Sequence, residues 1–369
     1  MIGEVRIENY KSIQKLKLEL GRVTVLIGEN GCGKSNILEA IALASAAADI
    51  KLDNEFLASR GIRVTEPQLM RSAFEMENLV KEIKIDLRWN DGQEFKCRLQ
   101  NDNSPYSQWV YDSNYYISYS PVYDFVSYHT GTNIEKNKIF KHQAYQIVCL
   151  KKFIIYSPEN QALRTFEKEG QIQPLGINGE GLFKLLKFLN SDDHQEHLKE
   201  IKKKLQLIDW FQDFEAPPNL SNIQNSLQIK DRYLDPDLTY FDQRSSNEGF
   251  LFLLFYFALF ISDITPKFFA IDNIDASLNP RLCRRLMQEL VELAKKHDKQ
   301  VIFTTHNPAV LDGLDLDDDE QRLFVIYRNQ LGHTKARRIL KPEPLEGQEP
   351  VKLSEAFLRG YIGGLPKNF

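Results

Sequence analysis

The hydrophobic pattern of the first fifty residues alternates and then takes a helical spacing. Apolar and polar side chains alternate in VRIENY and in LKLEL, and the following segment, Val23–Ile27, is apolar and largely β-branched. Because a period of two is typical of a half-buried strand, these segments predict strands. A glycine-rich stretch separates them from Ile37–Ala48, whose apolar spacing predicts a helix. The expected order is therefore strands, a loop and a buried helix.

A second group of apolar segments lies in the last third of the chain. The twelve-residue run Phe250–Ile261 predicts a buried helix, and three apolar runs after it predict strands. These strands are Phe268–Asp272, Val301–Thr305 and Arg322–Arg328. Strands that alternate with helices favour an α/β core with parallel strands.

The middle of the chain has a weaker pattern. Leu79–Trp89 and Glu94–Leu99 predict a hairpin around an Asn-Asp-Gly turn. The tyrosine-rich tract 101–132 is interpreted as an insertion whose rings pack on a neighbouring lobe, with stacking on nucleic-acid bases as the alternative.

Residues 178–212 are predicted to be helical, with a charged central part that contains His194 and His197. Two histidines three residues apart on a helix could bind a metal. Because the sequence around them offers no third ligand, a solvated helix face is the preferred interpretation.

Composition and charge exclude several classes of protein. With 47 basic and 51 acidic residues, the chain has a net charge of -4, so any contact with DNA must be a local patch. The four cysteines are scattered singly, which favours a reducing cytoplasm over a disulfide framework. The longest apolar run is too short for a bilayer, which needs about 20 residues, and the charged N-terminus is unlike a secretion signal. A cytoplasmic protein without a membrane partner is expected.

The glycine-rich stretch carries the most specific chemistry. Its sequence, GENGCGKS, satisfies the phosphate-loop pattern G-x-x-x-x-G-K-[ST] between a strand and a helix. Backbone amides there can contact phosphate oxygens, Lys34 can neutralise the β/γ charge, and the Ser35 hydroxyl can bind Mg²⁺. The candidate nucleotide-binding residues are Gly28, Glu29, Asn30, Gly31, Cys32, Gly33, Lys34, Ser35 and Asn36.

Two apolar strands end in residues that complement this loop. Phe268–Asp272 has the form of a Walker B strand, whose terminal acid completes the Mg²⁺ site with Ser35. The run 301–305 is followed by His306, which could reach the γ-phosphate at the carboxyl edge of the same sheet.

Residues 1–40 resemble the opening of the ABC-type ATPases of the OLD, RecF and SMC group. The segment Asp272 to Pro280, which includes Asp275, is similar to their Walker B and D-loop, and TTHNP is similar to their switch-histidine motif. SSNEG, residues 245–249, is similar to the ABC signature with a stretched spacing, and Ser246 is its preferred serine. In that family the signature contacts the γ-phosphate of ATP bound to the other subunit.

The resemblance implies an α/β, ABC-type ATPase head over residues 1–369. It would combine a parallel sheet around the phosphate loop, antiparallel N-terminal strands and a helical lobe. The expected parts are a nucleotide-binding core (1–50 and 241–369), a β-rich or inserted region (51–150) and a helical lobe (151–240).

The sequence also departs from the family pattern. The residue after the Walker B acid is normally a glutamate that polarises the attacking water, and here it is Asn273. An amide cannot accept the proton, so hydrolysis should be slow or depend on Asp275 or a neighbour. The Gln-loop is ambiguous between Gln68 and Gln161. The acidic run 315–320 is interpreted as a solvated loop, and the residues after His306 are too few for the Toprim nuclease of OLD proteins.

The resemblance implies a protein that binds ATP and Mg²⁺ and dimerises, or forms a higher oligomer, around ATP. The C-terminal KLSEAFLRGYIGGLPKNF resembles ATPases of antiphage systems such as Septu and certain retrons. The expected function is control of an effector, a nuclease or toxin encoded nearby, in antiphage defence. The alternatives are a RecF-like DNA-repair ATPase and a nucleotide-gated scaffold with little turnover, and DNA binding stays open.

Overall fold

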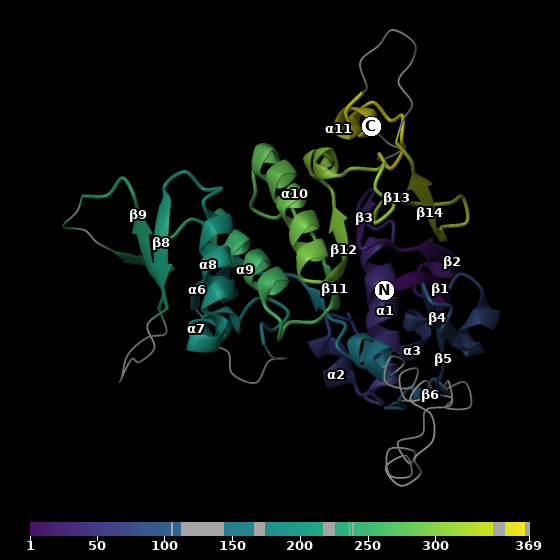
Figure 1. Ribbon diagram of the computed structural model, residues 1–369. Coiled ribbons are helices and arrows are strands. Elements are labelled where there is room, and N and C mark those ends of the chain that lie inside the picture. Colours follow the sequence, from purple (N-terminus) through teal and green to yellow (C-terminus); the bar gives the residue numbers. More distant parts are fainter. Residues whose placement is uncertain are drawn as a thin grey trace, which may run out of the picture.

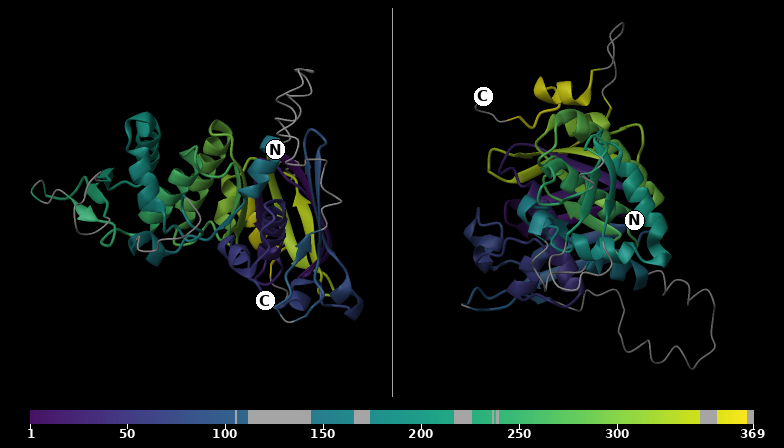
Figure 2. Two further views of the ribbon diagram at one scale, coloured as in Figure 1. Left: turned by 90° about the horizontal axis from the view of Figure 1, so that it is seen from below. Right: turned by 90° about the vertical axis from the view of Figure 1, so that its left-hand side faces the viewer.

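The computed structural model describes residues 1–104, 106–111, 144–165, 174–216, 226–235, 237, 240–341 and 351–365. Figures 1 and 2 show a helical lobe at one end, an antiparallel sheet at the other, and a parallel sheet between them. Most of the tyrosine-rich tract lies outside the described residues, so its interpretation as an insertion stays a prediction.

Among the described residues, the central sheet has six strands in the order β14-β13-β3-β12-β11-β7. Neighbouring strands are parallel except for β14, which is antiparallel to β13. The strands are β3 (Val23–Ile27), β7 (Ile155–Tyr156), β11 (Phe268–Ile271), β12 (Gln300–Thr305), β13 (Gln321–Arg328) and β14 (Thr334–Ile339). The predicted α/β class and its parallel strands are confirmed.

This sheet separates two hydrophobic cores. In β3, Val25 and Ile27 belong to one core while Leu26 belongs to the other, as the period of two along a strand requires. Strand β12 divides its side chains in the same way, with Phe303 on one face and Ile302 on the other. The apolar runs of the sequence are therefore strands buried on both faces.

Helix α1 (Lys34–Ala48) lies between the parallel sheet and the antiparallel sheet. The antiparallel sheet has the order β2-β1-β4-β5-β6. Its strands are β1 (Ile2–Tyr10), β2 (Ile13–Glu19), β4 (Ile83–Trp89), β5 (Glu94–Gln100) and β6 (Val110–Tyr111). The predicted hairpin is present, although β4 begins at Ile83 because the preceding residues form a 3-10 helix, η1 (Met76–Val80). Two short helices, α2 (Asn54–Ser59) and α3 (Pro67–Met70), precede η1.

The lobe contains helices α6 (Asn160–Thr165), α7 (Leu182–Leu189), η3 (Asp192–His194) and α8 (Gln195–Leu205) and a sheet of β8 (Phe211–Glu215), β9 (Gln228–Asp231) and β10 (Phe241–Asp242). The prediction of helix over residues 178–212 is wrong at its end. Phe211 and Phe214 are both buried within β8, and a β-bulge between them brings both side chains to the core.

Helix α9 (Glu248–Ile261) joins the lobe to the core. It contacts α6, α7 and α8 of the lobe and also α10 (Pro280–Lys296), and its residues from Phe250 to Ile261 are all buried. The buried helix predicted over this run is confirmed. Within the described part of the chain, no helix combines the length and apolar character that a membrane span requires. The remaining elements are η4 (Pro308–Gly313) and α11 (Leu353–Leu358).

Candidate nucleotide-binding site

The loop between β3 and α1 has the backbone of an anion site. Gly33 precedes α1 with φ 106°, and a Cβ at this position would lie 2.2 Å from the Thr334 hydroxyl oxygen. Only glycine therefore fits there without displacing a neighbour. No side chain caps the N-terminus of α1, and its first turn carries no acid. The first amides of α1 are thus available to an anion.

Lys34 is buried beneath this loop. Its Nζ donates hydrogen bonds to the carbonyl oxygens of Gly28, at 2.8 Å, and Glu29, at 3.1 Å. Burial lowers the pKa of the amine, while the nearby Asp272 and Asp275 carboxylates act in the opposite direction. The charge of Lys34 is therefore held at the loop, within electrostatic reach of the two carboxylates.

The ends of α1, β11 and β12 meet at one edge of the parallel sheet. The Ser35 hydroxyl donates to Oδ2 of Asp272 at 2.9 Å, joining residues 237 positions apart. The Thr304 hydroxyl binds Oδ1 of the same carboxylate and accepts from the backbone amide of Asn273 at 2.9 Å. The motif TTHNP contains Thr304, but the sequence did not indicate that Thr304 holds the Asp272 carboxylate.

The backbone explains the amide at position 273. Asn273 is exposed and has φ 57°, in the left-handed region that asparagine tolerates better than most residues. The next candidate base, Asp275, accepts a hydrogen bond from the Thr305 hydroxyl at 2.5 Å. Thr305 therefore orients Asp275 as Thr304 orients Asp272.

His306 follows β12 at the same edge of the sheet. The His306 side chain is exposed, but its imidazole is partly desolvated, which lowers its pKa. The nearby positive charge of Lys34 lowers this pKa further. The structure thus brings His306 together with Lys34 and the two carboxylates.

A basic pocket of about 410 Å³ adjoins the phosphate loop, with Ser12, Asn36 and Arg63 in its lining. The Asn36 amide donates to Ser12 at 2.6 Å, and Arg63 donates to the Asn36 side-chain oxygen at 3.1 Å. Lys11 and Arg328 also line it, and Arg328 donates to the Gly31 carbonyl at 3.0 Å. Sequence reasoning missed these cations because they are 17 residues or more outside the motif and belong to different elements.

The signature-like segment lies at the N-terminus of α9. Asn247 caps the helix by accepting from the amide of Phe250 at 2.8 Å. Ser246 is buried, and its hydroxyl has no hydrogen-bond partner among the described residues. Glu248 binds the Ser277 hydroxyl, which ties this segment to the residues after Asp275.

The two glutamines proposed for the Gln-loop lie in different places. Gln161 is exposed in α6, shortly after β7, the strand that pairs with the Asp272 strand. Gln68 is exposed in α3, whose last residue, Met70, accepts from the amide of Lys11 near the antiparallel sheet. Gln161 is the better candidate for the Gln-loop, because it follows the edge strand of the parallel sheet.

Two further expectations concern charged groups. The acidic run is a loop before β13, and its Asp318 pairs with Lys295 at 2.6 Å. His194 and His197 are half-buried, and His197 has two further polar side chains beside it that the nearby sequence does not contain. Folding brings His297 and Asp263, which are distant in sequence, next to it.

Together, the parallel sheet, the loop before α1 and the acids at this edge give the chain the fold of an ABC-type ATPase head. The chain belongs to the family described as "AAA domain, putative AbiEii toxin, Type IV TA system", whose profile matches residues 23–312.

Solved structures support the fold. The chain is similar to an SMC head bound to the C-winged helix domain of ScpA, with a TM-score of 0.58, 15% identity, and 92% of this chain and 98% of that chain covered. It is also similar to the Smc head domain with an extended coiled coil bound to the C-terminal domain of ScpA derived from Pyrococcus furiosus. There the TM-score is 0.53 and the identity 13%, over 92% of this chain and 96% of that one.

Two curated proteins are similar to this chain over short segments. The chain is 42% identical over 67 residues to the uncharacterized protein MJECL10 of Methanocaldococcus jannaschii, and the match covers 16% of this chain and 31% of that protein. It is 38% identical over 55 residues to the DNA replication and repair protein RecF of Bacillus thuringiensis, covering 15% of each. These matches therefore span less than a third of either relative's length.

Proposed function

We propose that this protein binds ATP with Mg²⁺ at the loop between β3 and α1. The observation that carries the proposal is the 2.9 Å hydrogen bond between Ser35 and Asp272, which unites two separate sequence motifs at one point. Hydroxyl and carboxylate oxygens are the ligands that Mg²⁺ prefers, so these two side chains fit the ion. Mg²⁺ would neutralise phosphate charge, and Lys34 would exchange its loop carbonyls for phosphate oxygens.

The basic pocket beside Asn36 suits the remainder of the nucleotide. Lys11, Arg63 and Arg328 give it positive charge, and Phe74 lines it with an aromatic ring that packs against His333 at 4.8 Å between ring centroids. Arg63 and Lys11 both pair with Glu39, which holds the two cations at this side of α1. A ribose and base would lie here, next to the phosphates.

The site becomes complete when two chains associate. The Ser246 hydroxyl is buried and has no hydrogen-bond partner among the described residues, so it would gain a hydrogen bond by turning outward to a group on a second chain. In the family, that group is the γ-phosphate of ATP on the other subunit. ATP would then hold two chains together, while ADP, which lacks the γ-phosphate, would release them.

Turnover would be slow. Asn273 occupies the position after the Walker B acid, and its amide cannot accept a proton from the attacking water. Asp275, whose carboxylate is oriented by Thr305, is the alternative base. A long-lived ATP state would suit a protein whose output is a change of shape or association.

The biological role is control of a partner effector, a nuclease or toxin, in antiphage defence. Support comes from the family description, which names a toxin–antitoxin system, and from the resemblance to ATPases of Septu and certain retron systems. The similarity to an SMC head bound to a ScpA domain favours a protein partner. The region 50–240, including tract 101–132, would supply the docking surface.

The second candidate is a RecF-like DNA-repair ATPase, favoured by the 38% identity to RecF over 55 residues. The third is a nucleotide-gated scaffold, favoured by Asn273. DNA binding and turnover separate the three. A repair ATPase should bind duplex DNA with a steep dependence on salt, whereas a scaffold should show no hydrolysis.

The test is a phage plating assay with this chain and its adjacent genes, combined with DNA-binding anisotropy of the purified chain at 50 and 200 mM salt, conditions chosen to expose phosphate contacts. Defence predicts protection that Lys34→Ala abolishes and DNA affinity too weak to show a salt slope. ATP-dependent DNA binding that weakens about 10³-fold or more over this range, without protection, would instead establish the RecF-like function.

A further inference from the structure

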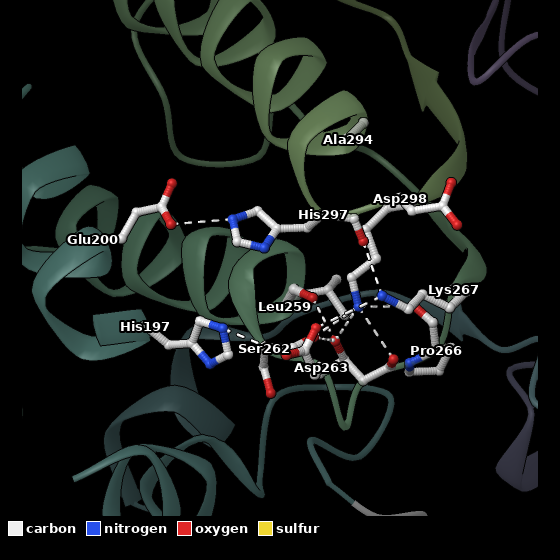
Figure 3. Close-up of polar contacts among 12 residues, drawn as sticks. His197, Glu200, Leu259, Ser262, Asp263, Pro266, Lys267, Ala294, His297 and Asp298 are labelled. Atoms are coloured by element: carbon white, nitrogen blue, oxygen red, sulfur yellow. Dashed lines mark hydrogen bonds and ion pairs between the residues drawn. The ribbon is translucent and has the colours of Figure 1, made fainter. Parts of the chain in front are cut away.

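A cluster of two histidines and an aspartate lies away from the nucleotide site, where the lobe meets the core. His197 is on α8, His297 follows the last residue of α10, and Asp263 is in the turn between α9 and β11. Figure 3 shows the three side chains converging from these elements. Sequence spacing could not predict this cluster because its members are up to 100 positions apart.

The donor atoms lie close enough to share one ion. One ligand atom from each residue lies within 4.8 Å of the other two. A tetrahedral ion with bonds of about 2.0–2.2 Å holds its donor atoms about 3.4 Å apart. Rotations about side-chain bonds would close the remaining gap without moving the helices.

A carboxylate orients one of the rings. Glu200 accepts from Nε2 of His297 at 3.1 Å, and its other oxygen pairs with Lys296 at 2.7 Å. Figure 3 shows the second nitrogen of His297 on the side of the ring that faces His197 and Asp263. Histidines that bind metals almost always use their other nitrogen in this way, to contact a carboxylate or carbonyl.

The other contacts of His197 and Asp263 leave their donor atoms facing each other. Nε2 of His197 lies 3.5 Å from Oδ2 of Asp263, whereas Nδ1 of His197 is buried without a partner among the described residues. The polar contact of His197 therefore points into the cluster. Lys267 approaches the other oxygen of Asp263, Oδ1, at 3.7 Å, so Oδ2 stays available.

We propose that His197, Asp263 and His297 bind one divalent transition-metal ion. Zn²⁺ matches the donors best, because two imidazoles and one carboxylate are typical of zinc sites that keep a fourth position for water. Mg²⁺ and Ca²⁺ prefer sites made of oxygen, so they would not compete effectively. The site is independent of the proposed function at Lys34.

Metal binding would fasten the lobe to the core. The ligands come from α8, from α10 and from the turn that leads into the Asp272 strand, so one ion would cross-link three elements. An ion that binds the folded chain and not the unfolded one raises the melting temperature as its concentration exceeds the dissociation constant.

The experiment uses the full chain without nucleotide, with excess Mg²⁺ present, and titrates it with Co²⁺ while visible absorption is recorded. The expected result is one equivalent of Co²⁺ with the spectrum of a tetrahedral ion, displaced by Zn²⁺. His197→Gln and His297→Ala should each abolish this signal. Glu200→Gln should weaken binding about 10–100-fold, as loss of such an orienting carboxylate typically does.

His194→Ala is the matched control, because His194 precedes the same helix and stacks near His197 but is outside the cluster. It should leave the Co²⁺ signal and the Zn²⁺-dependent rise in melting temperature unchanged. Far-ultraviolet circular dichroism without metal should show that His197→Gln and His297→Ala are folded. Absence of a one-equivalent signal in the native chain, or an equal signal in folded His297→Ala, would overturn the proposal.

Discussion

The core and the lobe organise their polar residues in different ways. In the core, residues distant in sequence meet because parallel strands end at one edge of the sheet, as Ser35 and Asp272 do. In the lobe, α8 packs on α9 and buries Leu198 and Ile201, and its histidine reaches other polar groups because these helices pack together. Short motifs therefore locate the core site, whereas the lobe cluster depends on tertiary packing.

The two regions also differ in how firmly their polar side chains are held. The acids of the core are held by Thr304 and Thr305 on a strand buried on both faces. Ser246, just before α9, has a buried hydroxyl with no hydrogen-bond partner among the described residues. The two acids of the core are therefore held in place by hydroxyls, whereas no hydrogen bond fixes the Ser246 hydroxyl within the described part of the chain.

The largest expected effect tests the chemistry of the core. Asn273→Glu places a carboxylate where the water-polarising base normally lies, so ATP turnover should rise by about 10²–10⁴-fold. The left-handed backbone at this position should cost roughly 1–2 kcal/mol of stability. Steady-state phosphate release measures the first effect and thermal unfolding the second. Asn273→Ala is the control and should give no gain; fast native hydrolysis that survives Asp275→Ala would place the base elsewhere.

The next effect compares a lysine of the core with one of the lobe. Lys34→Ala removes the charge that meets the phosphates, so ATP affinity measured by titration calorimetry should fall by about 100-fold. Lys199→Ala, which removes an exposed lysine of α8, should leave affinity unchanged. Equal affinities of native chain and Lys34→Ala would show that nucleotide does not use this loop.

The smallest effect distinguishes the two Gln-loop candidates. Gln161 follows the strand that borders the Asp272 strand, so Gln161→Ala should lower turnover by about 2–10-fold, as loss of one neutral hydrogen bond would. Gln68→Ala should leave turnover unchanged, because the Gln68 side chain is exposed and does not line the basic pocket, although its neighbour Leu69 does. The reverse result, measured under the same conditions, would assign the Gln-loop to α3.

Much of the fold was predictable because its signals are local. The apolar strands, α9 and the loop before Lys34 each occupy one continuous run, so the sequence pattern locates them directly. The end of α8 was not predictable, since β8 depends on a bulge that buries both Phe211 and Phe214. Arg63, Thr304 and His297 were missed for the same reason, because each acquires its role from a neighbour distant in sequence.

We expect ATP to join two chains through a site to which each chain contributes Ser246. Sedimentation velocity of the native chain with ATP, with ADP and without nucleotide tests it most directly, alongside Lys34→Ala and Ser246→Arg. We expect a dimer or larger assembly with ATP alone and a monomer for both variants under every condition. Identical sedimentation of the native chain in all three conditions, or an ATP-dependent dimer that survives Ser246→Arg, would contradict it.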